Sequence, residues 1–118
     1  MQSVSSSAVS NALSYSTTEQ LMGGKWIDGK PIYKKTFTFG AISANDSYQI
    51  STGGTSIDVL IKGEGCGYSG AFVPIVYADR LTSGILSWYW SENRIVVFTG
   101  SGRSLSSGAI TLYYTKTS

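Results

Sequence analysis

From Lys25 to the C-terminus the chain alternates short apolar segments with turn signals, and this pattern constrains its fold most strongly. The segments are rich in aromatic and β-branched residues, and Gly, Ser or Asn-Asp residues separate them. Such spacing is typical of short strands joined by turns. Because no stretch has a helical period long enough for a parallel crossover, neighbouring strands are expected to pair antiparallel. The chain is therefore predicted to be all-β, an antiparallel β-sandwich or jelly roll of roughly eight strands.

Two turns are predicted to close hairpins. Asp28-Gly29 is expected to occupy the centre of a type I′ turn, with a strand starting near Pro31. On that strand Tyr33, Phe37 and Phe39 should face the core, and Ile32, Lys34, Thr36 and Thr38 the wetter side. The polar segment "SENR" at 91–94 predicts the second hairpin. Further strands are predicted at 48–52, 56–63, 71–78, 84–90, 94–100 and 109–116, with the glycine-rich stretches 63–70 and 100–108 as loops.

Length and charge exclude several classes of protein. The 118 residues suit one domain, in which a Ser/Thr-rich stalk or linker at 1–22 precedes a head domain at 23–118. Net charge is only +2 and the nine Lys and Arg are scattered, which argues against a nucleic-acid partner. The longest apolar run, 71–78, is interrupted by Pro74 and is far shorter than a membrane span. The N-terminus lacks the features of a secretion signal, so an intracellular origin is expected.

The residues offer little for catalysis. The chain contains no histidine, which excludes Ser-His-Asp and Cys-His machinery and the commonest metal ligand. A glycosidase would need two of the seven carboxylates beside one cleft. The stretch "GCGYSG" matches a dinucleotide-binding pattern, but a strand follows it where a helix is required. Cys66 is the single cysteine and is expected to be a free thiol. A non-enzymatic domain without cofactor or metal is predicted.

Aromatic residues cluster at 88–90. Trp88 and Trp90 share one face of the predicted strand while Tyr89 points to the other. The two indoles could therefore lie in the core or form an exposed platform, and the usual burial of indoles favours the core.

Both ends of the chain resemble one family. The segment "YSTTEQLMGGKWIDGKPIYKKTF" is similar to "YSTEEQVVGKWIDGKPIYRKT", a form that recurs in phage and prophage tail-fibre or receptor-binding proteins of gut bacteria. There it introduces a compact β-rich C-terminal head that closes with a strand like "ITLYYTKTS". The resemblance covers roughly 15–37 and 109–118, and the doubled glycine of "MGG" at 22–24 departs from it. It implies a homotrimeric fibre tip of the virion, made in the bacterial cytoplasm, that contacts the host surface.

The function expected from these features is attachment to a bacterial surface receptor, a glycan or protein, with polysaccharide favoured. A chain with 13% aromatic and 14% charged residues would leave apolar surface that symmetric partners could cover. Alternatives are a structural tail or baseplate component, a monomeric carbohydrate-binding module and a small glycosidase. Aromatic rings stack on sugars and polar groups orient them, so the candidate ligand contacts are Tyr68, Trp90, Glu92, Asn93, Arg94 and Arg103.

Overall fold

A computed structural model describes residues 14–52, 55–76 and 84–117. The described residues form eight strands: β1 (Gln20–Lys25), β2 (Pro31–Phe39), β3 (Ser47–Ser51), β4 (Ile57–Tyr68), β5 (Phe72–Ile75), β6 (Leu86–Ser91), β7 (Arg94–Thr99) and β8 (Ser107–Lys116). Every strand pair is antiparallel. The predicted all-β class is confirmed. The strand predicted at 71–78 is β5, and residues 77–78 lie outside the described residues.

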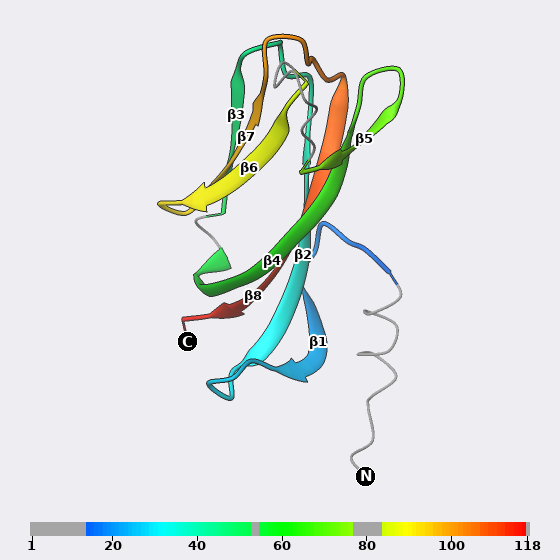
Figure 1. Ribbon diagram of the computed structural model, residues 1–118. Helices are drawn as coiled ribbons and strands as arrows, with labels where there is room; N and C mark the ends of the chain where they lie inside the picture. Colours follow the sequence, from blue (N-terminus) through cyan, green and yellow to red (C-terminus); the bar gives the residue numbers. More distant parts are fainter. Residues whose placement is uncertain (1–13, 53–54, 77–83, 118) are drawn as a thin grey trace.

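The strands form two sheets. The larger has the order β1-β2-β8-β4-β5 and the smaller the order β3-β7-β6. The smaller sheet covers one half of the long strands of the larger, and the β1–β2 hairpin extends beyond it (Figure 1). This two-layer arrangement confirms the predicted β-sandwich.

The core lies between the sheets. On β7, Ile95 and Val97 are fully buried, and on β8 so are Ile110, Leu112 and Tyr114. Alternate residues of both strands thus point into one apolar layer, as the pleat requires. The predicted core face of β2 is confirmed, because Phe37 and Phe39 are buried and Tyr33 is partly buried against the same core. Trp88 and Trp90 also pack against this core, which confirms the core interpretation of the two indoles.

The first hairpin closes differently from its prediction. Gly29 has a φ of 87°, but Asp28 does not have positive φ. The Gly29 N–H donates to the Trp26 carbonyl and the Trp26 N–H to the Lys30 carbonyl. The loop therefore holds three residues, a tight turn followed by a left-handed glycine, and the predicted type I′ turn is wrong here. Asp28 instead accepts a hydrogen bond from the Lys30 N–H, which a short carboxylate two residues away readily does.

The second predicted hairpin is confirmed. Its turn has the type I′ geometry that was expected for the first hairpin. Ser91 pairs with Arg94 across the β6–β7 turn. The two residues between them, Glu92 and Asn93, have φ values of 52° and 62°. Two consecutive left-handed residues match the twist of the strands that they join.

Most of the glycine-rich stretch 63–70 is strand, because only residues 69–70 lie outside β4, and this corrects the predicted loop. β4 continues to Tyr68, and its turn into β5 contains Gly70. A Cβ on Gly63 would lie 2.3 Å from the Trp88 ring, and one on Gly65 would lie 2.1 Å from the Ala109 carbonyl oxygen. The glycines therefore permit close approach within the sandwich, a role that propensity alone does not reveal. The stretch 100–108 is loop until β8 begins at Ser107.

Part of the predicted stalk belongs to the sheet. β1 begins at Gln20, inside the predicted 1–22 segment. Just before it, Glu19 accepts hydrogen bonds from the Tyr114 hydroxyl at 2.6 Å and the Lys116 ammonium at 2.9 Å. Partial burial alone would raise the pKa of Glu19, but these two donors outweigh burial and lower it. A contact 95 residues distant in sequence thus joins this segment to the last strand.

The same segment covers Lys34, which was predicted to face the wetter side. Lys34 is only 1% exposed. Its ammonium donates to the Ser14 carbonyl and lies 4.4 Å from the centre of the Tyr15 ring. Burial lowers the pKa of this ammonium. The prediction failed because alternation identifies the face of a strand but not what packs over it.

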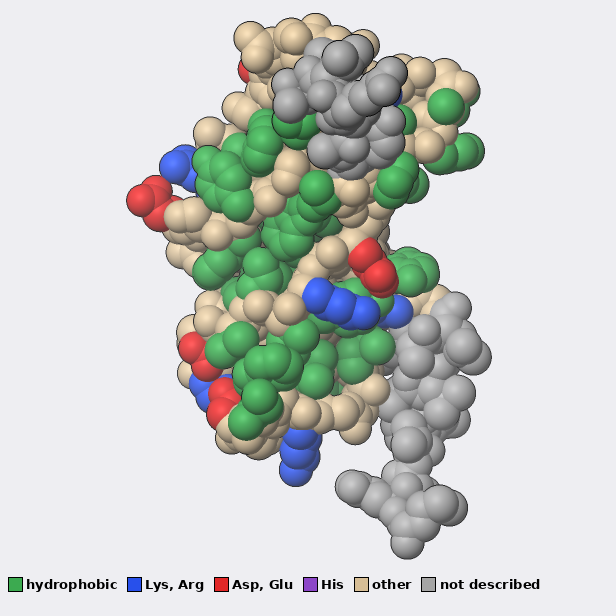
Figure 2. All heavy atoms as spheres, viewed as in Figure 1, with side chains coloured by type: hydrophobic (Ala, Val, Ile, Leu, Met, Phe, Trp, Pro, Cys, Tyr) green, Lys and Arg blue, Asp and Glu red, His purple; other side chains and the backbone are tan. Residues whose placement is uncertain are grey.

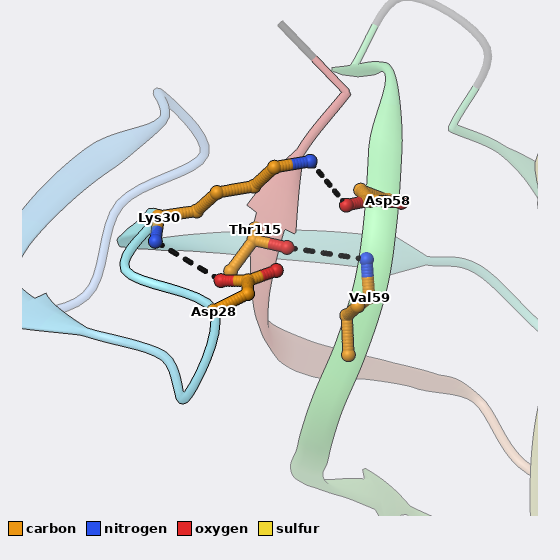
Figure 3. A network of polar contacts seen from close by, with 5 residues as sticks. All are labelled: Asp28, Lys30, Asp58, Val59 and Thr115. Carbon is orange, nitrogen blue, oxygen red and sulfur yellow. Dashed lines mark hydrogen bonds and ion pairs between the residues drawn. The ribbon is translucent and has the colours of Figure 1, made fainter.

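Polar contacts also join the first hairpin loop to β4 (Figure 3). Lys30 forms an ion pair with Asp58, and the Val59 N–H donates to the Thr115 hydroxyl at 3.2 Å. The β4–β8 register shifts between Ile57 and Leu60, which leaves Val59 outside the regular ladder. The buried Thr115 hydroxyl thus satisfies a backbone donor that a bulge exposes.

Candidate functional site

The outward face of the smaller sheet carries an exposed aromatic ring and a polar groove. Because Ile95 and Val97 point to the core, Arg94 and Val96 must face outward on β7. In register, Val96 lies between Gln49 of β3 and Tyr89 of β6. We call this surface the outer face of the smaller sheet.

Arg94 is positioned by two neighbours. Its Nη1 donates to Gln49 Oε1 at 3.3 Å, and its Nη2 donates to Glu92 Oε2 at 3.2 Å. The Arg94 side chain is 44% exposed and that of Glu92 is 78% exposed. A pair this exposed adds little stability, so its main effect is to orient the guanidinium along the sheet.

The turn behind Arg94 is anchored to β3. The Asn93 carbonyl accepts a hydrogen bond of 2.7 Å from the Thr52 N–H. The Thr52 hydroxyl in turn accepts one of 2.7 Å from Trp90 Nε1. Thr52 is buried, so these bonds form in a partly dry environment and fix the turn against the end of β3. The polar side chains of the turn therefore rest on a rigid base.

These elements enclose a shallow groove of about 370 Å³. Its lining comes from β3, β7 and the turn between β6 and β7: Gln49, Ser51, Glu92, Asn93 and Arg94. The volume lies near the lower end of the range for small-molecule sites, and the groove is open to solvent. It suits a small polar ligand or the end of a longer one.

Tyr89 lies on the same face but is not among the residues that line the groove. Its side chain is 53% exposed, and its ring packs against Phe98 with centroids 6.2 Å apart. Tyr89 and Arg94 are diagonal neighbours on adjacent strands, a relation that places Cα atoms about 7–8 Å apart. An exposed ring and a guanidinium thus stand on the same face of the sheet, on adjacent strands.

The structure brings together three of the six predicted contact residues. Glu92, Asn93 and Arg94 all line the groove. Trp90 does not, because its indole packs on the core and its Nε1 is bonded to Thr52. The structure therefore places the Trp90 side chain on the core face of β6, away from the groove, and its role as a ligand contact stays a prediction.

The other two predicted contacts lie elsewhere. Tyr68 ends β4 in the larger sheet and packs against Phe72, with ring centroids 5.2 Å apart. Arg103 lies in the loop before β8, and its Nε donates to the Gly84 carbonyl at 3.1 Å. Neither residue lines the groove.

Sequence reasoning missed Tyr89, Gln49 and Ser51. Alternation already placed Tyr89 opposite the two indoles, so burial of the indoles implied its exposure. For Gln49 and Ser51 no local signal exists, because their place beside Arg94 depends on the pairing of β3 with β7.

The groove contains one carboxylate among its lining residues, that of Glu92. Other described carboxylates are engaged away from it: Glu64 accepts from Tyr113, and Asp58 pairs with Lys30. Within the described residues, no group of three His, Cys, Asp or Glu side chains is placed to hold a metal ion. The chemistry available at the groove is therefore hydrogen bonding, stacking and charge.

Comparison with family models, curated proteins and solved structures found no match to this chain. No helix in the described part of the chain has the length and apolar character needed to cross a membrane.

Proposed function

We propose that this domain is a non-enzymatic adhesion module that binds a bacterial surface polysaccharide at the outer face of the smaller sheet. The observation that carries the proposal is the exposed Tyr89 ring on the same face as the groove that Arg94 lines. Sugars combine apolar C–H faces with hydroxyl groups, so their binding sites pair an aromatic surface with oriented donors and acceptors.

This face offers a partner for both the C–H groups and the hydroxyl groups of a sugar. The Tyr89 ring offers a surface for C–H groups, and Phe98 supports it from the neighbouring strand. The guanidinium of Arg94 supplies N–H donors, whereas Glu92 supplies carboxylate acceptors. The side-chain amide of Asn93 supplies both. Because these groups stand on paired strands and an anchored turn, little ordering is needed when a sugar binds.

The resemblance at both ends of the chain supports placing this module at the tip of a phage tail fibre, as a homotrimer. Threefold display would raise avidity, since several weak sites on one rigid body act together. An apolar row crosses the larger sheet, in which Leu21, Tyr33 and Leu60 are partly exposed and surround the buried Tyr114. Hydrophobic side chains gather on the half of that sheet left uncovered by the smaller one (Figure 2). This surface supports association between copies of the chain.

A structural role within the fibre is the second candidate. Exposed apolar side chains on β5 and just after it favour this role, because Phe72 is 77% exposed and Val76 is 61% exposed. Such side chains suit contact with another fibre component. A structural component would bind no glycan, so the glycan experiment below separates the two candidates.

Replacing Tyr89 or Arg94 by alanine is expected to weaken glycan binding about tenfold or more, because each removes a principal contact. The measurement is binding of the intact chain to an array of bacterial capsule and lipopolysaccharide oligosaccharides, followed by calorimetry on those that bind. Tyr68→Ala is the matched control, since Tyr68 is 42% exposed but lies on the other sheet. Equal losses for Tyr68→Ala and Tyr89→Ala would contradict the proposed site. Absence of binding to every glycan would contradict the proposed function.

Light scattering after size-exclusion chromatography should give a mass near three times the 12.6 kDa of the chain. Association should bury about 800 Å² on each partner if it is specific. Leu21→Arg, which places a charge on the apolar row, should lower the mass toward that of one chain. A wild-type mass equal to that of one chain would contradict the homotrimer. Glycan binding would then depend on the outer face of the smaller sheet in a single chain.

A further inference from the structure

We infer that Glu92 makes the groove selective for neutral sugars and excludes anionic ones. This inference rests on the proposed function and concerns the same outer face of the smaller sheet. It follows from the distribution of charge in the groove and from the geometry of the β6–β7 turn.

The charges that line the groove sum to zero. Arg94 carries the positive charge and Glu92 the negative one, and the other lining residues are Gln49, Ser51 and Asn93. Elsewhere on this face, the residues in register with Arg94 and Val96 are Ser51, Ser91, Gln49 and Tyr89, which carry no formal charge at neutral pH. A guanidinium without a carboxylate beside it would attract uronic or sialic acids. Here the Glu92 carboxylate already pairs with the Arg94 guanidinium.

An anionic sugar would have to displace Glu92 from Arg94 and then remain beside it. The tight turn fixes the Glu92 backbone, because the carbonyl of the next residue, Asn93, accepts a hydrogen bond from the Thr52 N–H, so the displaced carboxylate stays within one side-chain length of the groove. Two carboxylates would then share one groove, and like charges at short distance repel. A neutral sugar does not meet this repulsion.

The ion pair also offers a neutral sugar adjacent donors and acceptors. Arg94 presents N–H groups, while the Glu92 carboxylate beside them accepts hydrogen bonds. Neighbouring hydroxyls on a sugar ring can donate to one group and accept from the other. Because Tyr89 stands on the neighbouring strand of the same face, a further unit of a longer sugar chain can stack on its ring while the first occupies the groove.

The test compares a neutral oligosaccharide that binds on the array with the same oligosaccharide oxidised to a carboxylate at its primary alcohols. Wild-type protein should bind the neutral form at least tenfold more tightly. Glu92→Gln removes the negative charge but keeps an acceptor oxygen, so it should improve binding of the carboxylated form relative to the neutral form about tenfold. The gain should shrink as salt is added, because the exclusion is electrostatic.

Asp58→Asn is the matched control, since it changes net charge equally but lies on the larger sheet. It should leave the preference for the neutral form unchanged. Equal binding of both forms by the wild type, or an unchanged preference in Glu92→Gln, would overturn the inference while leaving glycan binding intact. Failure of the wild type to bind any neutral or acidic glycan would instead overturn the proposed function, and the inference with it. Thermal unfolding of each variant checks that the fold is retained.

Discussion

Leu112→Ala is expected to lower the free energy of unfolding by about 2–5 kcal/mol, with a value in the upper half of that range. Leu112 is fully buried on β8, in the middle of the larger sheet. Its side chain packs closely over Gly63, beside the Trp88 ring, because a Cβ added to that glycine would lie 3.1 Å from Leu112. Strands on both sides hold β8 in place, so the cavity left by the missing atoms cannot collapse easily. Chemical denaturation followed by tryptophan fluorescence measures the change.

Leu21→Ala is the matched control for this prediction. It removes the same atoms from β1, where Leu21 is 49% exposed. Because about half of the side chain already contacts water, the substitution loses only about half of the hydrophobic transfer free energy, and no closed cavity forms. The free energy of unfolding of the monomer should therefore fall by about 1 kcal/mol. Equal costs for the two leucine variants would show that the apolar layer between the sheets does not provide the main stabilisation. Because a typical domain is stable by about 5–15 kcal/mol, Leu112→Ala should remove a large share of the total.

Gly65→Ala is expected to destabilise the domain by about 3 kcal/mol, at the upper end of the range for overpacked sites. The added methyl group would lie 2.1 Å from the Ala109 carbonyl oxygen and 2.8 Å from the Ile110 Cα. Both are backbone atoms of β8, so no side-chain rotation can relieve the overlap. The strands β4 and β8 would have to separate locally, in the middle of their longest ladder. The midpoint of denaturation reports the loss.

Gly40→Ala tests whether the effect comes from the close approach or from glycine itself. Among the described residues, none beyond its two chain neighbours has a heavy atom within 4 Å of a Cβ built on Gly40, and its φ is not in the left-handed region. Alanine there should be neutral or stabilising by up to about 1 kcal/mol, because it restricts the unfolded chain. If Gly65→Ala were as mild as Gly40→Ala, the tight packing of β4 on β8 would be refuted.

The groove and the core depend on one another through the two indoles. Trp90 packs on the core and also donates to Thr52, whose N–H binds the turn that carries Glu92. Burial of the indoles and the position of the polar site therefore both depend on the same strand, β6. A strand that buries its indoles on one face must present Tyr89 on the other.

Local patterns in the sequence sufficed for the strands and their faces. Alternation along β2 identified Phe37 and Phe39 as core residues, and the "SENR" segment identified the β6–β7 hairpin. These features depend on residues a few positions apart, so they can be inferred without knowledge of the rest of the chain. The same reasoning placed Glu92, Asn93 and Arg94 together, because all three belong to one turn.

Features that depend on distant pairing were decided only by the tertiary structure. Gln49 bonds to Arg94 across 45 positions, and Glu19 bonds to Tyr114 across 95. Lys34 is buried because the segment before β1 lies over it, and the glycines of β4 are strand residues because Trp88 and β8 approach them closely. Alternation assigns a side chain to one face of its strand. What that face meets depends on which strands and segments the fold brings against it, and no local pattern carries that information.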